Sequence, residues 1–250
     1  MAEPVLSVRA LRKSFGGLRV SDDLDVDIMP GELHAVIGPN GAGKTTLINQ
    51  ISGLLAPDGG RIVFAGHDIT GVPAHVRARL GLARSFQITS VLPGFTVLEN
   101  VAVAVQARSG SSFRLFGRAA DEPELNRQAR AALDEVGLVD REHVPAGHLS
   151  HGEKRALELA IALALEPKLL LLDEPMAGTG REESERLVAA LQRLKGRFPM
   201  LLVEHDMTAV FALADRISVL IYGRILASGA PAEVRADQRV VAAYLGDEME

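Results

Sequence analysis

Cysteine is absent from the 250-residue sequence, which excludes disulfide bridges, thiolate zinc sites and cysteine nucleophiles and is compatible with a reducing compartment. An excess of basic residues is absent too. The formal net charge is −5 and no long basic run occurs, which argues against non-specific binding to nucleic acid.

Long hydrophobic runs are equally scarce. The longest, residues 159–165 and 169–172, are far shorter than the roughly 20 apolar residues of a membrane-spanning helix. The N-terminal sequence Met-Ala-Glu-Pro does not resemble a signal peptide. With 47% hydrophobic and 24% charged residues, we expect a soluble globular chain, long enough for one large domain or two modest ones.

A strand, a glycine-rich loop and a helix follow one another early in the chain. Residues 34–37 suit a short strand, and residues 38–45 read GPNGAGKT, which fits the phosphate-binding pattern G-x-x-x-x-G-K-[ST]. Apolar residues at helical spacing continue over residues 46–52, and Gly53 stands where a glycine commonly ends a helix. This order favours a P-loop over a glycine-rich turn without function.

The residue types of this loop suit a bound nucleoside triphosphate. Glycines let the backbone turn tightly and bring its N–H groups against phosphate oxygens, and the helix N-terminus adds partial positive charge. Lys44 is then placed for the β- and γ-phosphates, and Thr45 for Mg²⁺.

Strands alternate with helices along the chain, which predicts an α/β fold with a mostly parallel, P-loop (RecA-like) sheet. Early strands at residues 5–10 and 24–28, separated by a turn at residues 13–17, predict an N-terminal antiparallel β portion. The block at residues 88–160 is helical throughout and interrupts the sheet as an inserted subdomain.

We expect a single domain over residues 1–250, with a nucleotide-binding core, a helical subdomain and a tail. The core takes residues 1–87 and 161–235, the helical subdomain residues 88–160, and the C-terminal tail residues 236–250.

Two helix starts carry the pattern of a capping box, in which a hydroxyl residue and a glutamate three positions later cap each other's backbone. Thr96 and Glu99 form the first, and Ser150 and Glu153 form the second.

A second chemical signal is the apolar run at residues 169–172, which ends in Asp173 and Glu174. Such a run is typical of a parallel strand buried on both faces. On its own it would more often be an ordinary strand end. Together with the upstream P-loop, it places one carboxylate near Mg²⁺ and a second beside an attacking water.

Residues 149–153 read LSHGE and lie between the P-loop and the acidic strand. Here the chain resembles the ABC-type ATPases, whose signature L-S-G-G-Q lies in the same place. The resemblance covers essentially the whole chain. It extends to Gln87 at the family's Q-loop, His205 at its switch histidine and Phe15 where an aromatic ring stacks on adenine. Taken singly, His205, one of seven histidines, would more often have a structural role, and Phe15 would equally suit a place in the core.

A narrower resemblance is to the ATP-binding subunits of branched-chain, or more broadly hydrophobic, amino-acid importers. It depends on residues 85–87, residues 95–101, a polar insert near residues 106–123, and the C-terminal sequence Ala-Tyr-Leu-Gly at residues 243–246. The lipopolysaccharide-export ATPases are near relatives of this group.

The resemblance implies ATP and Mg²⁺ as cofactors and assigns each site residue a role. Catalysis falls to Glu174 as the base acting on water, His205 at the γ-phosphate, and Lys44. Mg²⁺ and its water shell are held by Thr45, Gln87 and Asp173. The residues that bind ATP are Phe15, Gly38, Asn40, Gly41, Ala42, Gly43, Lys44, Thr45, Thr46, Gln87, Ser150 and Gly152.

The same resemblance implies the partners. Two ATPase subunits, identical or different, face each other head to tail, so that each ATP touches the P-loop of one subunit and the signature of the other. Closure of the dimer on ATP drives separate transmembrane permease subunits. A solute-binding protein delivers the solute to these subunits. The chain is then cytoplasmic and peripheral on the inner face of the membrane, with no nucleic-acid partner.

Three positions depart from the family pattern. His151 and Glu153 replace Gly and Gln of the signature, and Gly180 replaces the Asp or Asn of the family's D-loop. Gly180 removes a polar contact across the dimer, which is compatible with a second, different ATPase subunit. Glu153 brings a carboxylate toward the γ-phosphate of the partner's ATP, where it would repel the phosphate.

The alternatives are a soluble ABC ATPase that acts on nucleic acid or ribosomes, an exporter-type ABC ATPase and a P-loop kinase. The first would need coiled-coil arms, a tandem second cassette or a basic surface, none of which the sequence has. A kinase has no reason to carry the signature and His205.

Overall fold

The structure, a computed structural model, describes residues 3–84, 91–109 and 122–242. By its internal contacts the chain divides into two compact units. The sheet unit comprises Met1–Leu82, Lys168–Glu174 and Lys195–Glu250, and the helical unit comprises Ala83–Pro167 and Pro175–Leu194. The domain bounds expected from the sequence stay a prediction.

The first sheet of the sheet unit is antiparallel, with strand order β2-β1-β4-β5. Its strands are β1 (Leu6–Phe15), β2 (Leu18–Ile28), β4 (Gly59–Phe64) and β5 (His67–Asp68). The predicted turn at residues 13–17 is wrong, because β1 continues to Phe15 and only Gly16 and Gly17 turn. A register shift around Ala10, which has a positive φ of 46°, breaks the alternation of apolar residues that marks a strand.

The second sheet has six strands in the order β10-β9-β3-β8-β7-β6. β3 is parallel to β8 and β9, and β7 is parallel to β8, whereas β9 and β10 form an antiparallel hairpin. This arrangement confirms the predicted α/β class with a mostly parallel sheet. The strands are β3 (Leu33–Ile37), β6 (Leu82–Arg84), β7 (Leu169–Asp173), β8 (Met200–Val203), β9 (Arg216–Ile221) and β10 (Arg224–Gly229).

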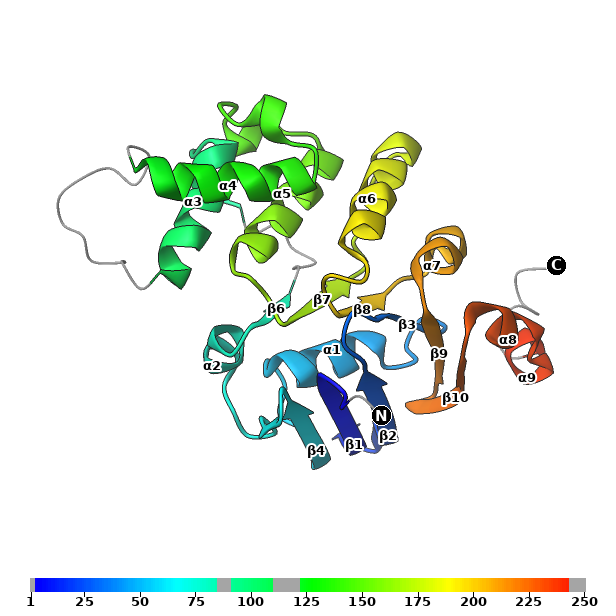
Figure 1. Ribbon diagram of the computed structural model, residues 1–250. Helices are drawn as coiled ribbons and strands as arrows, with labels where there is room; N and C mark the ends of the chain where they lie inside the picture. The colour runs from blue at the N-terminus through cyan, green and yellow to red at the C-terminus, as the bar shows by residue number, and fades with distance from the viewer. Residues whose placement is uncertain (1–2, 85–90, 110–121, 243–250) are drawn as a thin grey trace. The chain divides into compact units, whose positions relative to one another are not determined.

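Helix α1 (Lys44–Ser52) follows β3 and contacts β7 (Figure 1). Gly53 ends it in the left-handed conformation, as predicted. The fully buried Arg77 of α2 (Ala74–Arg79) donates to the carbonyls of Gln50 and Ile51 at this end, at 2.8 and 2.7 Å. A buried cation therefore holds the C-terminus of α1. The remaining helices of the unit are α7 (Met207–Leu213), α8 (Pro231–Ala236) and α9 (Gln238–Val240).

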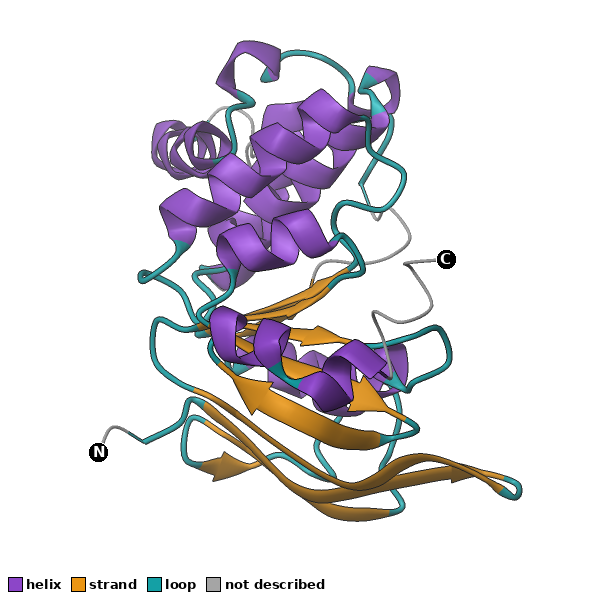
Figure 2. Cartoon of the chain, turned by 90° about the vertical axis from the view of Figure 1, so that its right-hand side faces the viewer, coloured by secondary structure: helices purple, strands orange, loops and turns teal. Residues whose placement is uncertain are grey.

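The helical unit is built from α3, α4 and α5, which pack against one another, and α6, which contacts α4 and α5. Figure 2 shows the packed helices of the chain in purple and its strands in orange. Both predicted capping boxes are present, with Thr96 and Glu99 at α3 and Ser150 and Glu153 at α5. The elements are α3 (Val97–Arg108), α4 (Pro123–Glu135), α5 (His151–Ala164), α6 (Arg181–Leu194) and the short 3₁₀ helices η2 (Val139–Arg141) and η3 (Ala146–His148).

The length and hydrophobicity of the helices decide whether any of them could span a membrane. In the parts of the chain that the structure describes, every helix is too short or too polar to cross a bilayer.

The P-loop strand β3 carries His34, the centre of a buried polar cluster, which is 1% exposed. Its Nδ1 lies 3.0 Å from the carbonyl oxygen of Asp27 and its Nε2 lies 2.8 Å from the hydroxyl of Ser218. Burial, and then the charge of Arg216, lower the pKa of His34 from 6.5 to about 4. The imidazole is therefore neutral in the folded chain at pH 7.

The difference between the pKa of His34 in the unfolded and in the folded chain predicts that stability depends on pH. Between pH 6.5 and 4 the unfolded chain protonates His34 and the folded chain does not, so stability falls as pH is lowered. The free energy of unfolding, measured in urea, should drop by up to about 3 kcal/mol across this window on account of His34. His34→Gln, which cannot titrate, should show a shallower dependence. An unchanged dependence in that variant would contradict the assignment.

Candidate nucleotide-binding site

The P-loop, residues 38–43, is shaped by close approaches of other backbone segments. A Cβ atom on Gly38 would lie 2.1 Å from the carbonyl oxygen of Leu220, and one on Gly43 would lie 2.5 Å from that of Val20. Both distances are too short for any side chain. Gly43 also has a φ of 108° and, as the N-cap of α1, has no side chain that could cap the helix, so the N-terminal N–H groups stay free for an anion.

Lys44 folds over this loop. Its ammonium donates to the carbonyl oxygens of Gly38 at 2.6 Å and Pro39 at 3.1 Å, and the residue is buried. Burial lowers the pKa of Lys44, while the negative charges of Glu174 and Asp173 oppose this change. The structure thus brings the P-loop lysine within the electrostatic reach of Asp173, the last residue of β7, and of Glu174, which follows it.

The acidic end of β7 has an unusual backbone. Asp173 is its last residue and fully buried, and Glu174 has a φ of 49° while its N–H donates to the carbonyl oxygen of Val203 at 2.8 Å. A left-handed conformation is costly for glutamate, of order 1–3 kcal/mol, and such strain clusters at functional sites. Glu174 is thus the first residue beyond the strand, in a strained conformation and partly exposed.

The donor set suits magnesium in chemistry. Thr45 on α1 and Asp173 on β7 offer a hydroxyl and a carboxylate, the hard oxygen ligands that Mg²⁺ prefers. The described residues contain no group of three or more histidine, cysteine or acidic side chains arranged to hold a metal ion by themselves. This is compatible with Mg²⁺ rather than against it, because Mg²⁺ usually takes one or two carboxylates and completes its shell with waters and phosphate oxygens.

A residue that the sequence reasoning missed supports the adjacent strand end. Glu204, directly after β8, is fully buried and accepts hydrogen bonds from the backbone N–H groups of His205 at 2.8 Å and Asp206 at 3.2 Å. The same carboxylate oxygen lies 3.5 Å from Nδ1 of His205, whose side chain is 61% exposed. Glu204 therefore fixes the turn that presents His205. Its signal in the sequence was a carboxylate straight after an apolar strand.

Phe15 lies at the end of β1, paired with Leu18 of β2, and half of its surface is exposed. Two residues beyond Leu18, Val20 makes the close approach to Gly43. The hairpin that carries Phe15 is thus the same one that contacts the P-loop. The ammonium of Lys13 lies 5.7 Å from the ring centroid.

The remaining expected ATP ligands are distributed around the loop. Asn40 and Gly41 are exposed, Ala42 is buried, and Thr45 and Thr46 are partly exposed on the first turn of α1. Gln87 lies outside the described residues.

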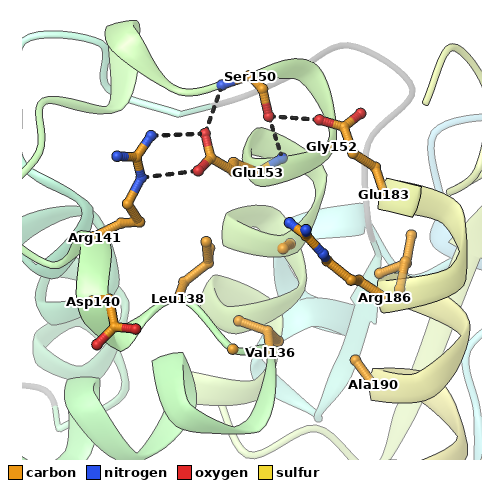
Figure 3. A pocket seen from close by; sticks show the side chains of 13 residues that line it. Val136, Leu138, Asp140, Arg141, Ser150, Gly152, Glu153, Glu183, Arg186 and Ala190 are labelled. Atoms are coloured by element: carbon orange, nitrogen blue, oxygen red, sulfur yellow. Dashed lines mark hydrogen bonds and ion pairs between the residues drawn. The ribbon is translucent and has the colours of Figure 1, made fainter. Parts of the chain in front are cut away.

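The signature segment belongs to the helical unit (Figure 3). Glu153 accepts a hydrogen bond from the backbone N–H of Ser150 at 2.8 Å, and its carboxylate also pairs with Arg141 at 2.9 Å. Burial opposes the charged form, but hydrogen bonds from Ser150 and Arg141 prevail and lower the pKa of Glu153. The sequence reasoning did not foresee Arg141, which compensates the charge that Glu153 brings to the signature.

Comparison with known proteins agrees with this geometry. The family profile described as ABC transporter matches residues 21–177, and a profile described as branched-chain amino acid ATP-binding cassette transporter matches residues 224–250. The ADP conformation of MJ1267, an ATP-binding cassette of an ABC transporter, superposes with a TM-score of 0.85 at 30% identity, over 98% of this chain and 100% of that chain.

Two curated relatives match over nearly the full length. The high-affinity branched-chain amino acid transport ATP-binding protein LivG of Escherichia coli K12 is 36% identical over 99% of this chain and 100% of its own. BraF of Pseudomonas aeruginosa, of the same description, is 37% identical over the same shares. The chain therefore belongs to the ABC transporter family, as one of its ATP-binding proteins. Within that family it is of the branched-chain amino acid transporter, LivG-like type.

The position of Lys44 yields a prediction for nucleotide binding. Lys44→Met should weaken ATP binding about 10- to 100-fold, since it removes one or two charge-assisted hydrogen bonds to phosphate. Lys168→Met, which changes an exposed lysine of the same unit, is the matched control. Titration with a fluorescent ATP analogue measures both, and equal affinities would contradict the role of Lys44.

Proposed function

We propose that this chain hydrolyses Mg²⁺-bound ATP with the residues that its two strand ends and its P-loop bring together. The observation that carries the proposal is the position of Lys44. Its ammonium is folded over the P-loop and lies close enough to Asp173 and Glu174 for their negative charges to act on its pKa. When ATP binds, the ammonium exchanges its two carbonyl partners for phosphate oxygens. The exchange needs no large motion because the loop already surrounds it.

The remaining roles follow from position. The P-loop backbone and the start of α1 bind the phosphates, with Gly38, Asn40, Gly41, Ala42, Gly43, Thr45 and Thr46 as the contacting residues. Phe15 stacks on the adenine. Thr45, Asp173 and Gln87 hold Mg²⁺, which neutralises phosphate charge when it is bound.

Glu174 then acts on the attacking water. Glu174 lies just past the end of β7 in a strained conformation, and its neighbour Asp173 is the last residue of the strand. His205, held by Glu204 and exposed, contacts the γ-phosphate and stabilises the charge that develops there. The two adjacent carboxylates have different roles, Asp173 at Mg²⁺ and Glu174 at the water, because the backbone changes from an extended to a left-handed conformation between them.

A complete site takes two ATPase subunits. Ser150 and Gly152 of one subunit contact the nucleotide held on the P-loop of the other, and the N-terminus of α5 supplies partial positive charge. Because Gly180 offers no side chain, the second subunit contributes the better D-loop if the dimer is mixed. Opening and closing of this dimer drives permease subunits that span the membrane, with this chain on the cytoplasmic face.

The transported solute is a branched-chain amino acid, delivered by a solute-binding protein and moved inward. Two observations support this: the relatives LivG and BraF, and the match of residues 224–250 to a branched-chain amino acid profile. The latter covers the C-terminal tail, which the ATPase chemistry does not need.

Glu174→Gln tests the chemistry. The variant should keep ATP binding but lose turnover by about 10² or more, because a positioned base contributes roughly that factor. ATP should then accumulate a stable dimer, seen by size-exclusion chromatography with light scattering. Glu182→Gln, an exposed glutamate of α6, should retain turnover. Near-normal hydrolysis by Glu174→Gln would assign the base elsewhere.

Reconstitution tests the substrate. In proteoliposomes that contain the permease subunits, this chain and the solute-binding protein, leucine, isoleucine and valine should stimulate ATP hydrolysis. Lysine and glutamate are the controls. Equal stimulation by the charged amino acids would rule out a branched-chain specificity while leaving the ATPase assignment intact.

A further inference from the structure

The hydroxyl of the signature serine is already engaged inside the helical unit. Ser150 Oγ accepts a hydrogen bond from the N–H of Glu153 at 3.2 Å and donates to Oε1 of Glu183 at 2.7 Å (Figure 3). A serine hydroxyl has only one hydrogen to donate. While Glu183 holds it, Ser150 cannot donate to a phosphate.

Glu183 lies on the first turn of α6, and its carboxylate is placed against the start of α5. A Cβ atom on Gly152 would lie 2.4 Å from the carboxyl carbon of Glu183, and the second oxygen accepts from the N–H of Gly180 at 3.3 Å. The hydrogen bond from Ser150, followed by that from Gly180, lowers the pKa of Glu183. A charged carboxylate therefore covers the end of α5 at which a phosphate would approach.

The structure offers the Glu183 carboxylate a second position. Beside Ser150 the helical unit has a pocket of about 470 Å³, lined by Glu183 itself, Arg141 and Arg186 together with apolar side chains. Arg186 lies three residues after Glu183 on α6, the spacing at which opposite charges on a helix pair. Its guanidinium lies 3.6 Å from the carboxylate of Glu182, a long contact for an ion pair, and 77% of its side chain is exposed. Figure 3 shows Arg186 beside the pocket, below the Ser150–Glu183 bond.

We propose that Glu183 is a positioning residue which holds the Ser150 hydroxyl within one subunit and yields it only when the partner's nucleotide displaces its carboxylate. The proposal rests on the function proposed above, in which Ser150 meets the partner's γ-phosphate. Two anions cannot share this helix end, because they repel each other and compete for one hydroxyl hydrogen. Closure of the dimer therefore requires Glu183 to leave, toward Arg186.

Dimerisation with ATP tests the competition. In the Glu174→Gln background, Glu183→Gln and Glu183→Ala should lower the ATP concentration for half-maximal dimer formation by about three- to tenfold, the strength of an exposed charge-assisted hydrogen bond. Glu185→Gln removes the same charge from an exposed glutamate of α6 that pairs with Arg181 rather than Arg186, and it should change nothing. The affinity of the monomer for ATP should be equal in all variants. If Glu183 only stabilised the fold, tighter dimerisation at unchanged monomer affinity would not be expected. Unchanged or weaker dimerisation in both Glu183 variants overturns the proposal.

A second measurement is independent of dimerisation. Inorganic phosphate is titrated into the nucleotide-free chain, and the backbone amide signals of Gly152 and Glu153 are followed by NMR. Phosphate should shift these signals in Glu183→Ala but not in Glu185→Ala or the parent chain. Equal shifts, or none, in all three overturn the proposal. If no variant binds ATP, the proposed function fails instead, and the phosphate titration still decides the role of Glu183.

Discussion

The nucleotide site depends on the close packing of the P-loop backbone against strands from two different sheets. Gly38 lies against the carbonyl of Leu220 in β9, and Gly43 lies against that of Val20 in β2. The antiparallel sheet is therefore more than a platform for Phe15, because it forms one wall of the phosphate cradle. This constraint explains why the N-terminal hairpin, far from the acidic strands in sequence, belongs to the same site.

The chemistry is placed by neighbouring parallel strands. β7 and β8 run in register, with Asp173 opposite Val203, so the residues that follow both strands emerge at one edge of the sheet. At this edge each strand is followed by a pair of successive residues of different burial: Asp173 and Glu204 are fully buried, whereas Glu174 is partly exposed and His205 is exposed. Each strand end thus pairs a buried carboxylate with a neighbour that solvent can reach.

Local patterns predicted most of the fold and much of the site, since the P-loop, the apolar strands and both capping boxes are each written within a few residues. The failures have physical causes. A bulge at Ala10 hid the continuation of β1. Arg141 and Glu183 were missed because their partners lie 12 and 33 positions away, where only the folded chain brings them together. Gln87 stays a prediction.

Arg77 has a consequence for how α1 responds to its ligand. Each of its hydrogen bonds goes to a carbonyl oxygen, two of them at the C-terminal end of α1, so a permanent cation faces the negative pole of the helix. A bound phosphate faces the positive pole. Helix α1 then lies between two opposite charges, the guanidinium of Arg77 at its C-terminus and the phosphate of the nucleotide at its N-terminus. Because Arg77 is part of the chain, it holds the C-terminus of α1 whether or not a nucleotide is bound.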